Sequence, residues 1–215
     1  MAKFFKNEAD LVRFIILNIQ KDDPKCLLAK NVHLYPLILK ESKNTLHFRE
    51  KVKSRLSELY EIHPGQPDID VLEYHPESDY LVGYEIKHIT IKEKKKRIKS
   101  PDEIKQFDDL IEFTKPPEFK ISHSFYAGID EALAYLSYGV DCAWLWHAFD
   151  DVDKGTIKQY VTSMRRVAAA LPVGYIAITE SNVYKKVQPQ TGPNGYLIKK
   201  EDRDIFYIST PKFPR

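Results

Sequence analysis

Acidic residues and a lysine stand at alternate positions in the stretch between residues 65 and 88. Asp68 and Asp70 come near its start, and Glu85 and Lys87 come near its end. Facing carboxylates repel one another unless a positive charge lies between them, and a hard divalent cation, usually Mg²⁺, is the natural occupant. A lysine beside them would orient an attacking water or offset charge on a phosphate oxygen in the transition state. Carboxylates, metal and lysine together suit the hydrolysis of a phosphodiester bond.

Alternation of polar and apolar residues in the same stretch predicts a β-hairpin. With a turn at residues 75–78, Tyr74 faces Asp79, and the same antiparallel register brings Asp68 opposite Glu85. One face of the hairpin then carries the charged residues and a glycine that leaves space among them: Asp68, Asp70, Gly83, Glu85 and Lys87. The other face carries the apolar set Ile69, Val71, Val82, Tyr84 and Ile86. A slip of one residue would mix charge with core, so the alternation favours this register.

The order of these residues resembles the PD-(D/E)XK nuclease superfamily, which includes restriction-endonuclease-like and Holliday-junction-resolvase-like proteins. Asp68 follows Pro67, and Glu85-Ile86-Lys87 begins seventeen residues after Asp68. In this superfamily the strand with the E-x-K motif is followed by a helix and then by another strand of the sheet. Residues 128–141 and 142–149 supply that order, and the resemblance covers about residues 46–180. It implies a Mg²⁺-dependent nuclease in which Mn²⁺ can replace Mg²⁺.

The resemblance also implies roles for individual residues of the hairpin. Asp68, Glu85 and the backbone carbonyl of Ile86 would bind the metal, and Lys87 would act in catalysis together with the two carboxylates. Asp70 shares the motif face, where it is either a second ligand or a hydrogen-bonded residue at the strand end.

Two helices are expected to bring further residues to the site. Members of the superfamily often add an acidic ligand from an earlier helix, and Glu50 resembles that ligand in order and distance, with Glu58 as its rival. Many members carry Gln or Tyr near the site on the helix after the motif. That helix offers Tyr135 as a nucleic-acid contact, while Glu131 stands where Gln would be expected.

A run of basic residues follows the motif strand, namely Lys92, Lys94, Lys95, Lys96, Arg97 and Lys99. Because this run emerges from the strand of Glu85 and Lys87, we expect it to bind the nucleic-acid backbone without reading sequence. The plain alternative is a solvated loop. A second match to the motif, at residues 101–105, lies in helix-like sequence and is interpreted as a helix start.

These observations predict an enzyme that hydrolyses DNA, more narrowly an endonuclease for duplex or branched DNA. Branched-DNA enzymes of the superfamily are commonly dimers, because two nicks need two sites, so we expect a homodimer. One alternative is a nucleic-acid-binding protein that keeps the fold without catalysis, although the intact Asp, Glu and Lys count against it. Another is a nuclease that cleaves RNA, because contacts to the backbone do not report the sugar.

Composition excludes several other classes of protein. The 215 residues are 43% hydrophobic and 30% charged with a net charge of only +2, so a packed domain is expected and any nucleic-acid surface must be local. Two cysteines without a CxxC motif exclude a disulfide scaffold or cysteine zinc site and favour an intracellular, cytoplasmic compartment. No apolar run approaches the roughly 20 residues of a membrane span.

The absence of P-loop, GxGxxG, GxSxG and HExxH motifs argues against a nucleotide cofactor, a serine hydrolase or a zincin. The lysine-, isoleucine- and tyrosine-rich composition resembles that of small proteins of thermophilic archaea and their viruses.

Hydrophobic periodicity predicts the elements that must position the site. Helices are expected at about 8–20, 46–60, 102–113, 129–138 and 153–170. Strands are expected at about 67–74, 80–90, 142–149 and 174–179, with weaker ones at 183–187 and 205–209. The stretch Val32–Leu39 is apolar enough for a strand, but Pro36 favours an edge strand or irregular structure there. The alternation of strands and helices predicts a single α/β domain over residues 1–215, with a restriction-endonuclease-like central mixed β-sheet flanked by α-helices. An N-terminal helical extension and C-terminal strands complete it.

Overall fold

The computed structural model describes residues 7–34, 37–40, 48–50, 54, 68–93, 119–121, 126–150, 154–179, 183–189 and 204–205. The helices are α1 (Glu8–Asp22), α4 (Ile129–Ser137) and α5 (Lys154–Ala170). The strands before α4 are β1 (Leu27–Leu34), β2 (Leu37–Lys40), β3 (Ile69–His75), β4 (Tyr80–Ile89), β5 (Ile91–Glu93) and β6 (Phe119–Ile121). The strands after it are β7 (Cys142–Phe149), β8 (Gly174–Thr179), β9 (Val183–Val187) and β10 (Asp204–Ile205).

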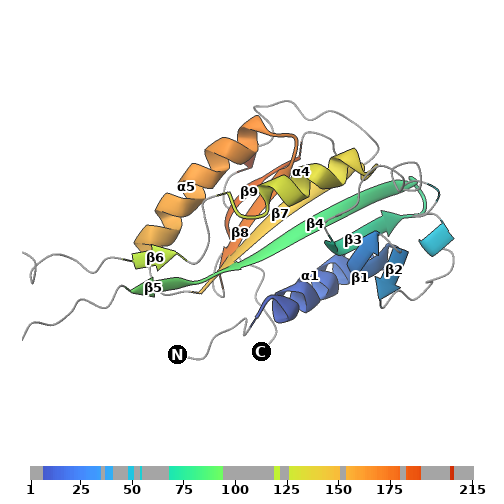
Figure 1. The fold of residues 1–215 in the computed structure, drawn as a ribbon, viewed down its shortest axis with the longest axis horizontal. Coiled ribbons are helices and arrows are strands. Elements are labelled where there is room, and N and C mark those ends of the chain that lie inside the picture. The colour runs from blue at the N-terminus through green and yellow to red at the C-terminus, as the bar shows by residue number, and fades with distance from the viewer. Residues whose placement is uncertain are drawn as a thin grey trace, which may run out of the picture.

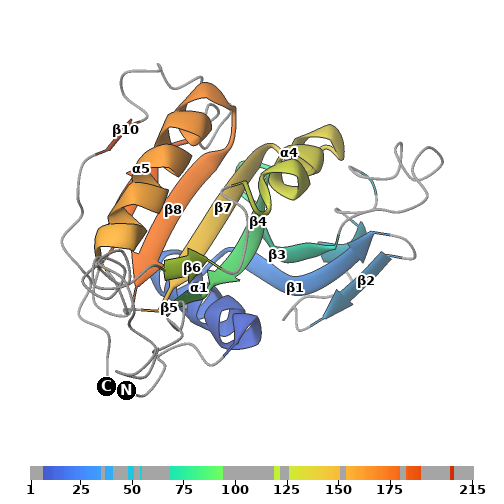
Figure 2. The same ribbon diagram turned by 60° about the vertical axis from the view of Figure 1, so that its left-hand side comes forward.

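Eight of these strands form one mixed sheet in the order β10-β9-β8-β7-β4-β3-β1-β2. The strands β4, β7 and β8 are parallel to one another, and the remaining neighbours are antiparallel. The helices α4 and α5 cover one face of the sheet, and α1 lies on the other (Figures 1 and 2). The predicted α/β domain, with a mixed sheet flanked by helices, is therefore confirmed.

Both faces of the central strands are buried, so each face of the β3–β4 hairpin carries apolar side chains. Under α1, Val71 and Val82 pack with helix residues such as Leu11 and Ile15. On the opposite face, Leu72 and Leu81 belong to the core beneath α4 and α5. The charged motif residues thus lie on the second of these faces, at the end of an otherwise apolar layer.

The N-terminal helix begins where its sequence predicts. The side chain of Asn7 accepts a hydrogen bond from the backbone N–H of Asp10, which satisfies one of the unpaired donors of the first turn. The prediction that Val32–Leu39 lies at a sheet edge or in irregular structure holds only in part. Its second half lies in the edge strand β2, whereas Val32–Leu34 belong to β1, which pairs with both β2 and β3.

The hairpin of β3 and β4 forms, but the predicted register was wrong by two residues. His75 pairs with Tyr80 and Val71 pairs with Tyr84, so the turn occupies residues 76–79 rather than 75–78. Asp79 supplies the left-handed backbone that this turn uses, with φ +50°, and accepts a hydrogen bond from the Tyr74 hydroxyl at 2.9 Å. A shift of two residues preserves the alternation of the two faces but changes which side chains stand opposite one another.

Several predictions fall outside the described residues. They include the predicted helix at 102–113, most of the predicted helix at 46–60, and residues 206–209 of the last predicted strand. The basic side chains of Lys94, Lys95, Lys96, Arg97 and Lys99 also lie outside, and only the backbone of Lys92 is described, in β5. Within the described part of the chain, no helix combines the length and the apolar character needed to cross a membrane.

Candidate active site

Asp70 and Glu85 stand on neighbouring strands of the hairpin. Continuing the pairing of Val71 with Tyr84 by one position places Asp70, rather than Asp68, opposite Glu85. The backbone N–H of Ile86 donates a hydrogen bond to Asp70 Oδ2 at 2.8 Å, which fixes this carboxylate against β4. The predicted pairing of Asp68 with Glu85 is corrected accordingly.

Lys87 joins the buried carboxylate of Glu85 to a second carboxylate on α4. Its ammonium contacts Glu85 Oε1 and lies 2.7 Å from Glu131 Oε2. The side chains are 2% exposed for Glu85, 22% for Lys87 and 40% for Glu131, so the cluster opens to solvent at Lys87 and Glu131. Glu131 occupies the position where the resemblance implies Gln, and there it contacts the lysine.

Tyr135 is completely buried, so the prediction that it contacts nucleic acid does not fit this structure. Its hydroxyl contacts Glu85 Oε2 and lies 2.9 Å from the backbone carbonyl oxygen of Asp68. Its ring packs on Gly83, where an added Cβ would lie 3.0 Å from Tyr135 Cδ2. The space that the glycine was expected to leave among the charged residues is therefore filled by the ring that holds Glu85.

The turn before α4 presses directly on the motif side chains. Gly128 has φ +79°, and a Cβ there would lie 2.9 Å from Glu85 Cγ and 3.2 Å from Lys87 Cε. His147 of β7 contacts this turn, because its Nε2 lies 2.9 Å from the Ala127 carbonyl oxygen. His147 is fully buried among aromatic rings.

Burial and crowding of like charges shift the titration of the cluster. Burial raises the pKa of Asp70 to about 7, although the Ile86 N–H opposes this shift. Burial, then a hydrogen bond with Glu131, then the charge of Asp70 raise the pKa of Glu85 well above its ordinary value. Burial would lower the pKa of Lys87, but its contacts with Glu131 and Glu85 outweigh burial and raise it. If all three carboxyls were ionised, their charge would exceed that of the one ammonium, so the cluster favours bound protons or a divalent cation in their place.

Asp68 points to a different partner. It lies just before β3, and its Oδ1 is 2.5 Å from Nδ1 of His33 on β1. Both side chains are partly open to solvent. No local sequence pattern indicates this contact, because the pairing of β1 with β3 joins segments 35 residues apart.

Glu50, the proposed ligand from an earlier helix, is exposed in the described helical residues 48–50. Phe48 of the same segment is buried and stacks on Tyr74, with ring centroids 6.0 Å apart. The rival Glu58 lies outside the described residues. A metal-binding role for Glu50 stays a prediction.

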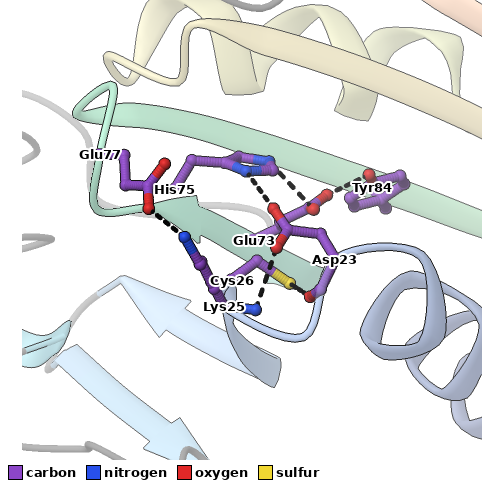
Figure 3. A network of polar contacts seen from close by, with 7 residues as sticks. All are labelled: Asp23, Lys25, Cys26, Glu73, His75, Glu77 and Tyr84. Carbon is purple, nitrogen blue, oxygen red and sulfur yellow. Dashed lines mark hydrogen bonds and ion pairs between the residues drawn. The ribbon is translucent and has the colours of Figure 1, made fainter.

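A second polar network lies on the α1 side of the same hairpin (Figure 3). His75 Nδ1 is 3.1 Å from Asp23 Oδ2, and His75 Nε2 is 3.0 Å from Glu73 Oε1. The Tyr84 hydroxyl donates to the other oxygen of Glu73, a carboxylate that is 4% exposed. The network connects the turn after α1 to both strands of the hairpin, and sequence reasoning missed it because Glu73 interrupts an apolar face.

Comparisons of the chain with protein-family models, with curated proteins and with solved structures gave no match. Among the described residues, no three His, Cys, Asp or Glu side chains surround a common point as a metal site would require. Mg²⁺, however, is usually held by one or two carboxylates together with substrate phosphates and water. Asp70, Glu85 and the adjoining Ile86 carbonyl are a donor set of that kind, so the residues present fit a hard divalent cation.

Proposed function

We propose that this protein is a divalent-metal-dependent nuclease that hydrolyses phosphodiester bonds of DNA. The observation that carries the proposal is the pair of carboxylates, half-buried Asp70 and buried Glu85, facing each other beside the Lys87 ammonium. Such a group, open to solvent on one side, combines the anionic ligands and the cation that hydrolysis of an anionic ester requires.

The order of elements around the cluster supports the restriction-endonuclease-like fold that the motif implies. The helix α1 precedes the antiparallel strands β1, β2, β3 and β4. After the short strands β5 and β6, the motif strand β4 is followed by α4 and by the parallel strand β7. A helix and then a further sheet strand after E-x-K is the order that the resemblance predicts. Fold alone does not define an activity, so the proposal depends on the side chains.

Asp70, Glu85 and the Ile86 carbonyl would hold the metal, which would polarise the phosphate and favour ionisation of the attacking water. The carboxylate next to Glu85 in the register is Asp70, so we assign Asp70 the ligand role predicted for Asp68. Lys87 would stabilise charge that develops on the phosphate oxygens. Tyr135 and Glu131 are positioning residues, because the first holds Glu85 and the second holds Lys87.

A cleavage assay with matched variants tests the proposal. Supercoiled plasmid, linear duplex, single strands, a four-way junction and an RNA hairpin are each incubated with Mg²⁺, Mn²⁺ or EDTA. Lys87→Ala should abolish cleavage, whereas Lys25→Ala should not. Lys25 is a suitable control because it pairs with Glu77 in a contact exposed to solvent, outside the cluster.

Each result of this assay separates the candidate functions. Metal-dependent cutting that Lys87→Ala abolishes supports the nuclease, and the preferred substrate identifies duplex, branched or single-stranded DNA. Preferential cleavage of the RNA hairpin would show that the substrate is RNA rather than DNA. Binding without cutting, equal in both proteins for every metal, would overturn the enzyme and leave a nucleic-acid-binding protein. Light scattering of the same samples tests the homodimer that the resemblance implies.

A further inference from the structure

The polar face of the site continues beyond the hairpin onto β1. The pairs Val32–Ile69 and Lys30–Val71 set the register between β1 and β3, and the next position outward brings His33 opposite Asp68. Facing residues of antiparallel strands project to the same side of a sheet. Asp68 alternates with Asp70, so His33 projects to the side that carries the carboxylate cluster.

Tyr135 links this outer pair to the inner cluster. Its hydroxyl contacts both the Asp68 carbonyl and the Glu85 carboxylate, so the two groups are separated by a single side-chain oxygen. Exposure rises along the face, from 2% for Glu85 and 22% for Lys87 to 35% for His33 and 52% for Asp68. The His33–Asp68 pair is therefore more open to solvent than Glu85 and Lys87, and a ligand can reach it.

The spacing of the strands fits a chain of phosphates. β1 and β4 flank β3, so two strand spacings of about 4.8 Å separate His33 from the motif strand, roughly 10 Å in all. Phosphates along a nucleic-acid strand recur about every 3.4 Å of helix axis. A strand whose reacting phosphodiester lies at Lys87 would thus carry another phosphate past His33, within a few nucleotides.

We propose that His33, held by Asp68, contacts a phosphate that flanks the reacting phosphodiester of the nucleic-acid strand. The proposal rests on the proposed function and extends it, because it requires a substrate strand that spans from β4 to β1 rather than a mononucleotide. Asp68 Oδ1 lies 2.5 Å from Nδ1 of His33, so Nε2 is the ring nitrogen that would contact the substrate. A protonated imidazole donates hydrogen bonds at both nitrogens, one to Asp68 and one to a phosphate oxygen.

Methylphosphonate substitution in the substrate tests this contact directly. In a Lys87→Ala background that prevents cleavage, binding is measured for oligonucleotides in which one phosphate at a time is made neutral. With His33 present, one flanking position should weaken binding about tenfold or more, as expected for a lost hydrogen bond to a charged group. With His33→Ala, binding should fall by a similar factor, and that same methylphosphonate should then have no further effect.

A structural role for His33 would give a different pattern. If His33 only ties β1 to β3, His33→Ala and each methylphosphonate will act additively, and that result overturns the proposal. His33→Gln retains a side-chain N–H donor and should recover part of the binding, and thermal unfolding of all variants identifies any that fail to fold. Failure of the wild type to bind or cleave any polynucleotide would instead overturn the proposed function itself. Cleavage by the wild type without coupling at His33 would overturn only this inference.

Discussion

At the scale of single residues, the two aspartates near the start of β3 have different partners. Asp70 faces Glu85 and accepts from the Ile86 N–H, whereas Asp68 contacts His33. We therefore expect Asp70→Asn to reduce Mg²⁺-dependent cleavage by roughly a hundredfold or more, as for loss of a metal contact, and Asp68→Asn to cost less. Single-turnover rates over a Mg²⁺ titration measure both. Equal losses in the two variants, or a larger loss for Asp68→Asn, would return the ligand role to Asp68.

The titration of Asp70 predicts how the metal-free protein responds to pH. Its pKa is raised to about 7 in the folded state, above the value of about 4 in an unfolded chain. The protonated carboxyl therefore favours folding at pH values below about 4, and this contribution is lost as pH rises through about 7. Glu85, whose pKa is also raised, extends the decrease to higher pH. The free energy of unfolding in EDTA should fall by a few kcal/mol across this range.

Urea unfolding at a series of pH values measures this decrease, with Asp70→Asn as the matched variant. The asparagine cannot ionise, so its stability should vary less between about pH 4 and 7. A wild-type protein whose stability in EDTA rises steadily over the same interval would contradict the assignment of a proton to Asp70.

At the scale of elements, the entry into α4 is the part that sets the geometry of the cluster. Gly128 has a left-handed backbone, and a Cβ added to it would lie against both Glu85 and Lys87. Gly128→Ala should cost roughly 1–2 kcal/mol of stability and also lower activity, because the methyl group displaces the two motif side chains. Gly139, with φ +90°, ends the same helix and provides a control with a similar backbone cost. Unfolding and cleavage measured together distinguish the variants, since Gly139→Ala should lose stability while its residual activity per folded molecule stays higher.

In the polar network on the α1 side, His75 lies between the carboxylates of Asp23 and Glu73 and so connects the turn after α1 to β3. The hydrogen bond with Glu73 raises the pKa of His75 against the opposing effect of burial, and Asp23 adds to the rise. Its contribution to stability is therefore fully present below the unfolded pKa of about 6.5 and is lost as pH rises through the higher folded pKa. His75→Gln should remove this dependence and cost roughly 1–3 kcal/mol at low pH, as for hydrogen bonds to charged groups.

Hydrogen exchange of the turn after α1 and thermal unfolding at several pH values test the His75 prediction. If the network only fills space, wild type and His75→Gln will show the same pH dependence, and the turn will exchange equally in both. Asp23→Asn offers a second variant, because it removes one of the two carboxylates while the buried Glu73 keeps its contact with Tyr84.

At the scale of the whole molecule, the parts that the sequence predicts best are those with local signals. The strands β7 and β8 begin and end where their apolar runs do, and the cap of α1 follows from Asn7. The alternation of polar and apolar residues at every second position predicts which side chains lie on each face of the hairpin. The register was less predictable, because the left-handed backbone of Asp79 moved the turn by one residue.

Contacts between distant segments set the limit of prediction from sequence. The types of the motif residues predict phosphodiester chemistry, which stays a prediction, whereas the pairing of Asp70 rather than Asp68 with Glu85 depends on the position of the turn. The roles of Glu131 and His33 depend on how α4 and β1 pack against the hairpin. No local pattern encodes those placements, since each joins elements that lie far apart in the chain.

Binding of a metal should couple the cluster to the stability of the entire fold. A cation that binds the folded protein alone raises the free energy of unfolding by about 2.7 kcal/mol at a hundred times its dissociation constant. Mg²⁺ should therefore raise the unfolding temperature of the wild type, and Asp70→Asn or Glu85→Gln should remove most of that shift. Lys87→Ala removes the cation that competes with the metal for Glu85. This variant should keep or strengthen the Mg²⁺-dependent shift while it loses cleavage, because the remaining carboxylates carry more uncompensated charge. A Lys87→Ala protein that loses both cleavage and the Mg²⁺ shift would show that the lysine acts by building the cluster rather than on the reacting phosphate.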